Sequence, residues 1–283
     1  MRPMRRPCSI LVLALLCLPG RAPAQDEPLA PSRRVVFSQR SDYGRVLVVD
    51  EGRLRHLRYD FVDGDDQSII RLDDPDCVPM DYVRHAALGV AICPKLRRVL
   101  MIGLGGGTYT TMLHRHMPGL EIDAVEINPV VVQAARAHFG LPDDPRYRIH
   151  VADGRIFLRR ARACWDLVFV DAYTGADDIP PQLADAGFFR LLAAHVCKGG
   201  VAMLNLSVEA SLEDRVLRSF SRRFAHTACL RTDDDQNLLA FGRGDGPLPS
   251  RQSLAEHAQR IQRSLRLPFD LSASVQRFGG CAP

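Results

Sequence analysis

The most restrictive feature of this sequence is a glycine-rich turn that directly follows a buried strand. Residues 99–111 read VLMIGLGGGTYTT. The apolar run Val99–Ile102 is continuous rather than alternating, which predicts a central parallel strand covered on both faces. Four glycines then let the backbone approach a ligand without interference from a Cβ atom: Gly103, Gly105, Gly106 and Gly107. A strand, such a turn and a helix in this order predict an α/β fold with a doubly wound sheet.

Three carboxylates lie at the ends of apolar runs, and we predict these runs to be parallel strands of this sheet. Glu126 ends one run, Asp153 follows the next and Asp171 ends LVFVD. Each alone fits a helix cap or a loop charge, but parallel strands bring their carboxyl ends to one crevice, where such sheets bind ligands. Glu126, with Ile127 beside it, is placed to accept hydrogen bonds from ribose hydroxyls, and Asp153, with Gly154, to hold an adenine amino group. The pattern therefore favours a nucleoside site.

The remaining pattern predicts four regions. Residues 1–24 read as a signal peptide, 25–95 as a small antiparallel β unit with a connecting helix, 96–245 as the nucleoside-binding domain, and 246–283 as a C-terminal helix and tail. A hairpin is expected near Gly52. Further ranges are assigned from periodicity: helices at 77–92, 134–139, 187–197, 212–224 and 250–265, a fifth core strand at 200–206, and a closing antiparallel pair at 225–230 and 237–241.

The N-terminus has the pattern of an export signal. Arginines precede the apolar stretch Ile10–Leu18, and Ala22 and Ala24 fit an A-x-A cleavage site. The apolar stretch is too short for a permanent membrane span. We expect cleavage near Ala24 and an exported, periplasmic protein. The alternative is a cytoplasmic protein with a misassigned start.

The charge balance gives no electrostatic case for nucleic acid. The net charge is +4, but four arginines lie in the first 24 residues, which contain no acid, and the rest of the chain has 33 basic and 33 acidic residues.

Six cysteines remain after the predicted cleavage. Cys164, Cys197 and Cys229 lie beside predicted core strands, so we expect them to pack as small hydrophobic residues. If a bridge exists, the pattern favours Cys77 with Cys93 or Cys281. No metal site is expected, because there is no CxxC pair and His114 and His116 point to different faces of a helix.

Five segments together resemble the spermidine synthase (polyamine aminopropyltransferase) family, a branch of the S-adenosylmethionine methyltransferase superfamily. They are the entry segment 41–50, the glycine turn, Val125–Asn128, residues 152–158 and Asp166–Asp171. The resemblance implies a methyltransferase-type, Rossmann-like sheet that binds S-adenosylmethionine or its decarboxylated form as co-substrate. It also implies that Glu126 binds the ribose, Asp153 the adenine, and that Asp171 is the base for an attacking amine. Tyr82 and Tyr173 are candidates for the walls of the substrate site, and simple packing is the alternative for each. The implied acceptor is a small-molecule amine. Whether the protein forms a homodimer is left open.

The chain departs from the family pattern where the family binds ammonium groups. Gly106 stands at the aspartate that holds the aminopropyl ammonium, and Thr174 at a second carboxylate for the polyamine. A family tyrosine-(glutamine or histidine)-glutamate stretch corresponds to Tyr82-Val83-Arg84. Buried ammonium groups need carboxylates, and Asp177, Asp178 and Asp185 are candidates to replace them.

Two other readings remain open from the sequence. An NAD-dependent oxidoreductase also uses an acidic residue at the position of Glu126, but its G-x-G-x-x-G turn requires glycine where Thr108 stands. An exported, non-catalytic nucleoside- or polyamine-binding protein on a transferase scaffold fits the lost acidic positions.

Overall fold

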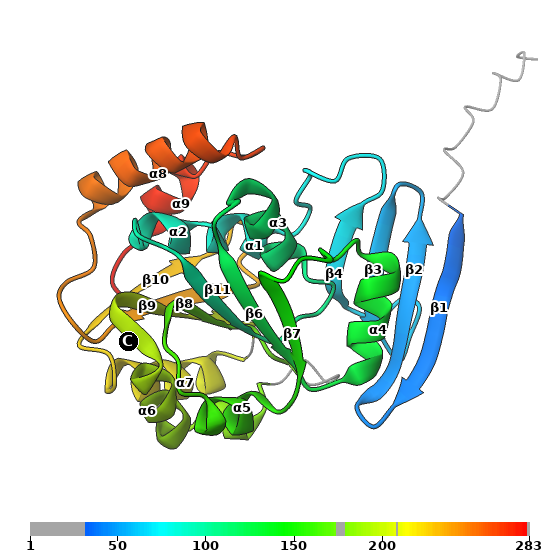
Figure 1. Cartoon of the computed structure of the whole chain (residues 1–283), viewed down its shortest axis with the longest axis horizontal. Helices are drawn as coiled ribbons and strands as arrows, with labels where there is room; N and C mark the ends of the chain where they lie inside the picture. Colours follow the sequence, from blue (N-terminus) through cyan, green and yellow to red (C-terminus); the bar gives the residue numbers. More distant parts are fainter. Residues whose placement is uncertain (1–31, 174–178, 208, 282–283) are drawn as a thin grey trace, which may run out of the picture. The chain divides into compact units, whose positions relative to one another are not determined.

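The computed structural model in Figure 1 describes residues 32–173, 179–207 and 209–281. The predicted signal peptide, and with it the cleavage site at Ala24, lies outside the described residues. So do Thr174, Asp177 and Asp178.

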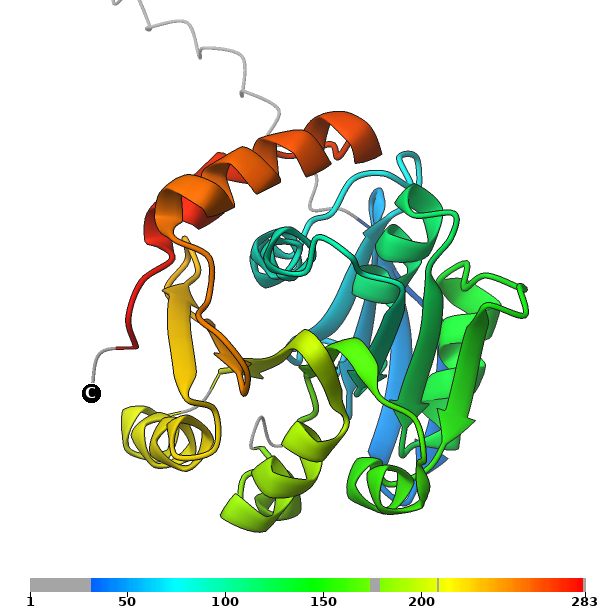
Figure 2. The same cartoon turned by 60° about the vertical axis from the view of Figure 1, so that its left-hand side comes forward.

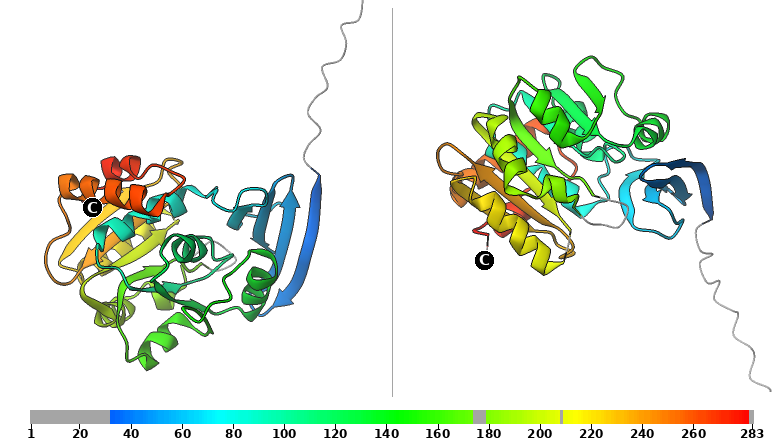
Figure 3. Two further views of the ribbon diagram at one scale, coloured as in Figure 1. Left: turned by 45° about the horizontal axis from the view of Figure 1, so that its top comes forward. Right: turned by 90° about the horizontal axis from the view of Figure 1, so that it is seen from below.

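The first four strands form an antiparallel sheet in chain order. They are β1 (Arg33–Ser41), β2 (Gly44–Glu51), β3 (Leu54–Tyr59) and β4 (Asp66–Arg71). Gly52, with φ +60°, lies in the turn between β2 and β3, which confirms the predicted hairpin. Val46, Val48 and Leu57 of this sheet pack against helix α4 (Pro129–His138), which lies between the small sheet and the large one (Figures 1 and 3).

A second sheet of seven strands has the order β10-β11-β9-β8-β5-β6-β7. Five of its strands are parallel to one another: β5 (Arg98–Ile102), β6 (Glu121–Glu126), β7 (Tyr147–Val151), β8 (Trp165–Val170) and β9 (Val196–Leu206). The last two, β10 (His226–Arg231) and β11 (Leu238–Arg243), are antiparallel, and β11 inserts between β9 and β10. This topology confirms the predicted methyltransferase-type sheet.

Helices cover both faces of the large sheet, as its continuous apolar strands require. Val99 and Met101 face one layer and Leu100 and Ile102 the other. The first layer contains α1 (Asp81–Ala86), α2 (Leu88–Ile92), α3 (Thr108–His116), α8 (Arg251–Leu265) and α9 (Ser272–Arg277). The second contains α5 (Gly154–Arg160), α6 (Ala186–Ala194) and α7 (Ala210–Ser221). Figure 2 shows α8 (orange) on the same side of the sheet as α2 (teal), which it contacts.

Several predicted helices have different bounds in the structure, and for two of them the cause is clear. The helix expected at 77–92 begins only at Asp81, after Pro79, and is divided into α1 and α2 at Ala87. The helix expected at 187–197 ends at Ala194, because Val196 already pairs with Trp165 at the start of β9. Pairing with the neighbouring strand overrides the local helical pattern there.

Our predictions for the cysteines were wrong. Cys164 forms a disulfide with Cys197, and Cys229 forms one with Cys281, with Cα–Cα distances of 5.0 and 4.7 Å. The first pair forms because Cys164 directly precedes β8 and Cys197 lies in the adjacent β9. The second forms because Gly279 pairs with Cys229 of β10 and brings the C-terminal segment alongside. The described cysteines with free thiols are Cys77 and Cys93.

A buried carboxylate links three strands of the large sheet. Asp123 of β6 accepts hydrogen bonds from Trp165 Nε1 and Arg148 Nε, both at 2.9 Å, and contacts His150 Nε2 at 2.9 Å. Burial opposes ionisation of this carboxyl, but the bonds from Arg148, His150 and Trp165 outweigh it and lower its pKa to about 2.

Among the helices in the described part of the chain, none combines the length and the apolar character that a membrane crossing requires.

Candidate active site

A cavity of about 1020 Å³ opens at the carboxyl ends of the parallel strands. The glycine turn after β5 and the residues that follow β6, β7 and β8 form its floor. Its other walls come from the small sheet, α1 and the connection between β10 and β11. Gly106 and Asp185 do not line the cavity, whereas nine of the residues that the sequence singled out for this site do: Tyr82, Gly103, Gly105, Glu126, Ile127, Asp153, Gly154, Asp171 and Tyr173.

The glycine turn is shaped by close backbone contacts. Gly103 has φ +92°, and a Cβ atom there would lie 2.0 Å from the carbonyl oxygen of Asp171. Only glycine therefore allows the end of β8 to lie against the turn. Gly106 lies behind the turn, where its N–H donates to Ser68 Oγ at 2.8 Å.

Glu126 combines a role in this turn with exposure to the cavity. Its side chain accepts hydrogen bonds from the N–H groups of Leu104 and Asn128, each at 2.9 Å. Burial raises the pKa of the Glu126 carboxyl, and the backbone N–H groups around it act in the opposite direction. Each carboxylate oxygen has a second lone pair, so Glu126 can accept further bonds from a ligand while it holds the turn.

Asp153 serves as the N-cap of α5, where it accepts a hydrogen bond from the N–H of Ile156 at 2.8 Å. The sequence left open whether this residue is a cap or a ligand group, and the structure gives it both the cap contact and a place in the cavity wall. Next to it, a Cβ atom at Gly154 would lie 2.5 Å from Ile102 Cγ2. The helix can therefore start this close to β5 only with glycine.

Asp171 lies at the centre of a polar network. Its Oδ1 accepts a hydrogen bond from Asn205 Nδ2 at 2.9 Å, and the Tyr82 hydroxyl is a second partner. Burial raises the pKa of the Asp171 carboxyl, and the bonds from Asn205 and Tyr82 reduce that increase. Burial, together with the charge of Asp171, also raises the pKa of Tyr82 well above its ordinary value. A partly buried carboxylate with a raised pKa is suited to accept a proton.

Asn205 was missed from the sequence, because an asparagine inside an apolar strand carries no local signal of its partner. It lies in β9, next to β8, and its Oδ1 accepts a bond from Asn237 Nδ2 at 2.9 Å. Tyr173 reaches the same strand, since its hydroxyl donates to the carbonyl of Asn205 at 2.7 Å and accepts from the N–H of Ser207 at 2.8 Å. Its ring lines the cavity while its hydroxyl positions β9.

Comparisons with known proteins agree with this geometry. Residues 82–234 match the family model for the spermine/spermidine synthase domain. A polyamine aminopropyltransferase of Chromobacterium violaceum is 32% identical over 84% of this chain and 92% of its own length. The chain belongs to the spermine/spermidine synthase family.

Two further similarities show the breadth of this spermidine synthase-like scaffold. A crystal structure of a spermidine synthase in complex with the transition-state analogue AdoDATO has a TM-score of 0.71 at 19% identity, covering 88% of this chain and 86% of that one. The eEF1A lysine and N-terminal methyltransferase of Mus musculus is 31% identical over 60% of this chain, but this chain spans only 26% of that protein's length. The family uses decarboxylated S-adenosylmethionine as co-substrate.

The structure accounts for two of the departures from the family pattern. A Cβ atom at Gly106 would lie 2.6 Å from Phe139 Cδ1 and 2.9 Å from Ser68 Cβ, so these side chains leave no room for the family's aspartate. Arg84, at the glutamate position, has its guanidinium bonded to the carbonyls of Val78 and Pro79 at 2.9 and 3.0 Å and to Asp81 at 2.6 Å.

Of the three carboxylates that the sequence offered as replacements, only Asp185 lies in the described part of the chain, and the cavity is lined by other carboxylates. Asp185 caps α6 through the N–H of Phe188 and pairs with Arg155 at 2.7 Å, and it is not among the residues of the cavity wall. Asp81, Asp233 and Asp234 do line the cavity, from α1 and from the connection between β10 and β11.

Proposed function

We propose that this protein is a transferase that takes S-adenosylmethionine or its decarboxylated form as donor and an amine as acceptor. The observation that carries this proposal is the convergence of Glu126, Asp153 and Asp171 on one cavity, with Asp171 bonded to Asn205 and Tyr82. The family relationship supports an aminopropyl group as the transferred group, and the methyltransferase relative makes a methyl group the second candidate.

The donor would be held by its nucleoside end. Glu126 would accept hydrogen bonds from the ribose hydroxyls through the lone pairs that the backbone N–H groups leave free. The second oxygen of Asp153 would accept a hydrogen bond from the adenine amino group. Ile127, which is 37% exposed beside Glu126, offers an apolar surface to the base. The donor's sulfonium makes its attached carbons electrophilic, so the protein has mainly to align the amine and remove its proton.

Asp171 would accept that proton. Its raised pKa brings its basicity closer to that of the amine than an ordinary aspartate's would be, and Asn205 holds its Oδ1 in a fixed position. Loss of a positioned base of this kind costs about 10²–10⁴-fold in rate.

The donor preference follows from Gly106. The family's aspartate at this position would attract the free ammonium of the decarboxylated donor and repel the carboxylate of the intact donor. Without it, and with Phe139 and Ser68 filling the space, we expect a weaker preference for the decarboxylated donor than a spermidine synthase shows.

Product analysis tests the proposal. The mature protein is incubated with putrescine and with each donor in turn, for wild type, Asp171→Asn and the control Asp214→Asn on the exposed side of α7. We expect transfer by wild type and by the control, and a loss of about 10²-fold or more for Asp171→Asn. Efficient spermidine formation from the decarboxylated donor alone would refute the donor argument, and an unimpaired Asp171→Asn enzyme would refute the base.

The lost acidic positions favour one alternative, a non-catalytic binding protein. Gly106 and the bonded Arg84 remove charges that the family uses for ammonium groups. Tight binding of the donor nucleoside without any transfer, in the same wild-type samples, would establish this alternative.

A further inference from the structure

A second polar cluster lies at the rim of the cavity, where α1 meets the connection between β10 and β11. It consists of Asp81, His85 and Asp233, and one ligand atom from each lies within 4.8 Å of the other two. Asp81 and Asp233 line the cavity, whereas His85 is only 3% exposed.

The ring of His85 points one nitrogen between the two carboxylates. Its Nδ1 lies 2.8 Å from Ser274 Oγ, whereas its buried Nε2 has no hydrogen-bond partner in the part of the chain that the structure describes. Nε2 lies 3.5 Å from Oδ2 of Asp81 and 3.5 Å from Oδ2 of Asp233. These separations are long for a hydrogen bond. In a tetrahedral site with metal–ligand bonds of about 2.1 Å, two ligand atoms lie about 3.4 Å apart, which is close to these separations.

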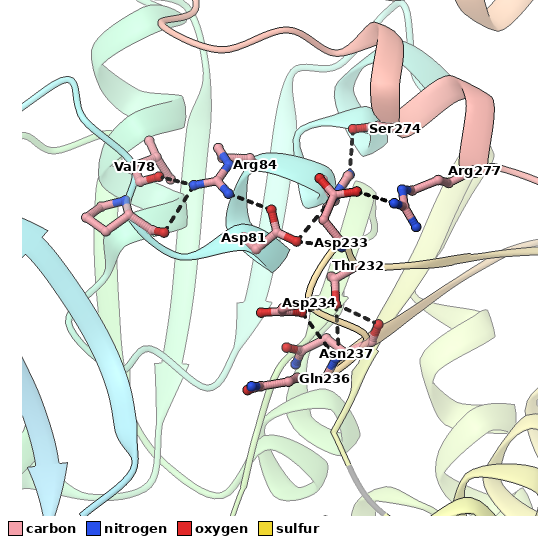
Figure 4. A network of polar contacts seen from close by, with 12 residues as sticks. Val78, Asp81, Arg84, Thr232, Asp233, Asp234, Gln236, Asn237, Ser274 and Arg277 are labelled. Atoms are coloured by element: carbon pink, nitrogen blue, oxygen red, sulfur yellow. Dashed lines mark hydrogen bonds and ion pairs between the residues drawn. The ribbon is translucent and has the colours of Figure 1, made fainter. Parts of the chain in front are cut away.

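Other groups hold the outer atoms of the three side chains, and Asp81 Oδ2, which faces Nε2, has a further backbone partner. Asp81 Oδ1 accepts from Arg84 at 2.6 Å, and Asp81 Oδ2 accepts from the N–H of Asp233 at 2.7 Å. Asp233 Oδ1 pairs with Arg277 of α9 at 2.5 Å. Figure 4 shows Asp81 and Asp233 next to each other between Arg84 and Arg277, with Ser274 above them. With Ser274 as acceptor for Nδ1–H, the lone pair of Nε2 faces the two carboxylates, as a metal-binding histidine requires.

We infer that Asp81, His85 and Asp233 form a binding site for a divalent transition-metal ion, Zn²⁺ or Mn²⁺. An imidazole with two carboxylates suits these ions, whereas Mg²⁺ and Ca²⁺ are bound by oxygen ligands alone. Three protein ligands leave a position for water, and the side chain of Asp233 is 53% exposed, so this position opens to solvent. The bound ion ties the connection between β10 and β11 to α1, the helix that carries Tyr82.

A network of ion pairs is the competing explanation. Two carboxylates and the guanidinium groups of Arg84 and Arg277 balance in charge, and a proton on His85 Nε2 would complete such a network without metal. The two explanations differ at Arg277. Its removal takes a repelling charge away from a bound cation, but it takes an attractive partner away from the network.

The experiment titrates the purified, untagged protein with Zn²⁺ after treatment with a chelator, by calorimetry, and uses Co²⁺ absorption to report the ligands. We expect one equivalent of Zn²⁺ and a rise in Tm with Zn²⁺ but not with Mg²⁺. Asp233→Asn keeps the shape and an oxygen for Arg277, and it should weaken Zn²⁺ binding by about 100-fold or more. Arg277→Ala should tighten binding severalfold. Asp235→Asn is the matched control, because Asp235 lies in the same connection outside the cluster and asparagine tolerates its φ of +59°.

Three results would overturn the inference: no Zn²⁺ bound by wild type, equal binding by Asp233→Asn, or weaker binding by Arg277→Ala. His85→Gln should also abolish binding. If that variant fails to fold because the position is buried, Asp233→Asn decides the question alone. All readouts are of metal binding, so the result is independent of any transferase activity.

Discussion

The dual role of Glu126 gives the most demanding prediction. Its carboxylate holds two backbone N–H groups, those of Leu104 and Asn128, each at 2.9 Å. In Glu126→Gln one oxygen remains for one of these groups, and the new amide N–H₂ faces the other. One buried donor without an acceptor costs about 1–3 kcal/mol in the free energy of unfolding. The variant should therefore fold with reduced stability.

The same substitution should weaken donor binding by a separate amount. Replacing a charged acceptor of ribose hydroxyls by a neutral one removes about 1.5–3 kcal/mol of binding free energy, which is about 10- to 150-fold in Kd. Urea unfolding measures the first effect, and calorimetry with methylthioadenosine and S-adenosylmethionine, at temperatures where both proteins are folded, measures the second. Glu121→Gln is the control, because Glu121 begins the same strand at its exposed, opposite end.

Each half of this reasoning can fail by itself. A folded Glu126→Gln protein that binds these nucleosides as tightly as wild type would refute the ribose assignment. Unchanged stability would refute the structural role in the turn. If wild type binds none of the nucleosides, the proposed donor site itself is wrong.

Four further outcomes are expected. The pKa of Asp171 is raised, so its basic, ionised form is lost as pH falls through that raised value. The acidic limb of the pH profile of kcat/KM should therefore lie above the ordinary aspartate value of 3.8. A limb at or below pH 3.8 would contradict the assignment of Asp171 as the base. The pKa of Asp123 is lowered from 3.8 to about 2. Its ionised form therefore contributes about 2 kcal/mol of stability that is present above pH 3.8 and lost as pH falls through about 2. Urea unfolding across this pH range should show that Asp123→Asn loses less stability in acid than wild type. Replacing Cys229 and Cys281 by serine should cost about 2–4 kcal/mol in the free energy of unfolding, which thermal or urea denaturation checks against Cys77→Ser. Mass spectrometry of the N-terminus from the native host should find cleavage after Ala24, and an intact Met1 in the cytoplasmic fraction would contradict export.

The parts of the fold that the sequence predicts are those with strong local signals. Val99–Ile102 and Leu167–Val170 are long, continuous apolar runs, and a strand buried on both faces is the direct physical reading of such runs. The carboxylates at the strand ends were predicted to share one crevice, and Glu126, Asp153 and Asp171 do line the same cavity. This prediction succeeds because parallel strands bring their carboxyl ends to the same edge of the sheet, independently of the loop conformations. Their roles in binding and catalysis stay predictions.

The parts that could not be predicted depend on contacts between distant segments. Cys229 and Cys281 are separated by 52 residues, and their pairing is decided by how the C-terminal segment returns to β10. Asn205 meets Asp171 only through the order of strands. His85 has an ordinary helical neighbourhood, and nothing near it in the sequence points to Asp233. Asp153 shows a different limit, since a helix cap and a ligand group have the same sequence pattern and one residue can be both.

The contact between Gly103 and Asp171 couples the position of the glycine turn to that of the proposed base. The carbonyl of Asp171 occupies the space where any side chain at position 103 would begin, so a substitution that moves the turn would also move the residue that we propose as the base. For protein engineering, it means that any residue larger than glycine at position 103 requires a matching change in the chain at Asp171.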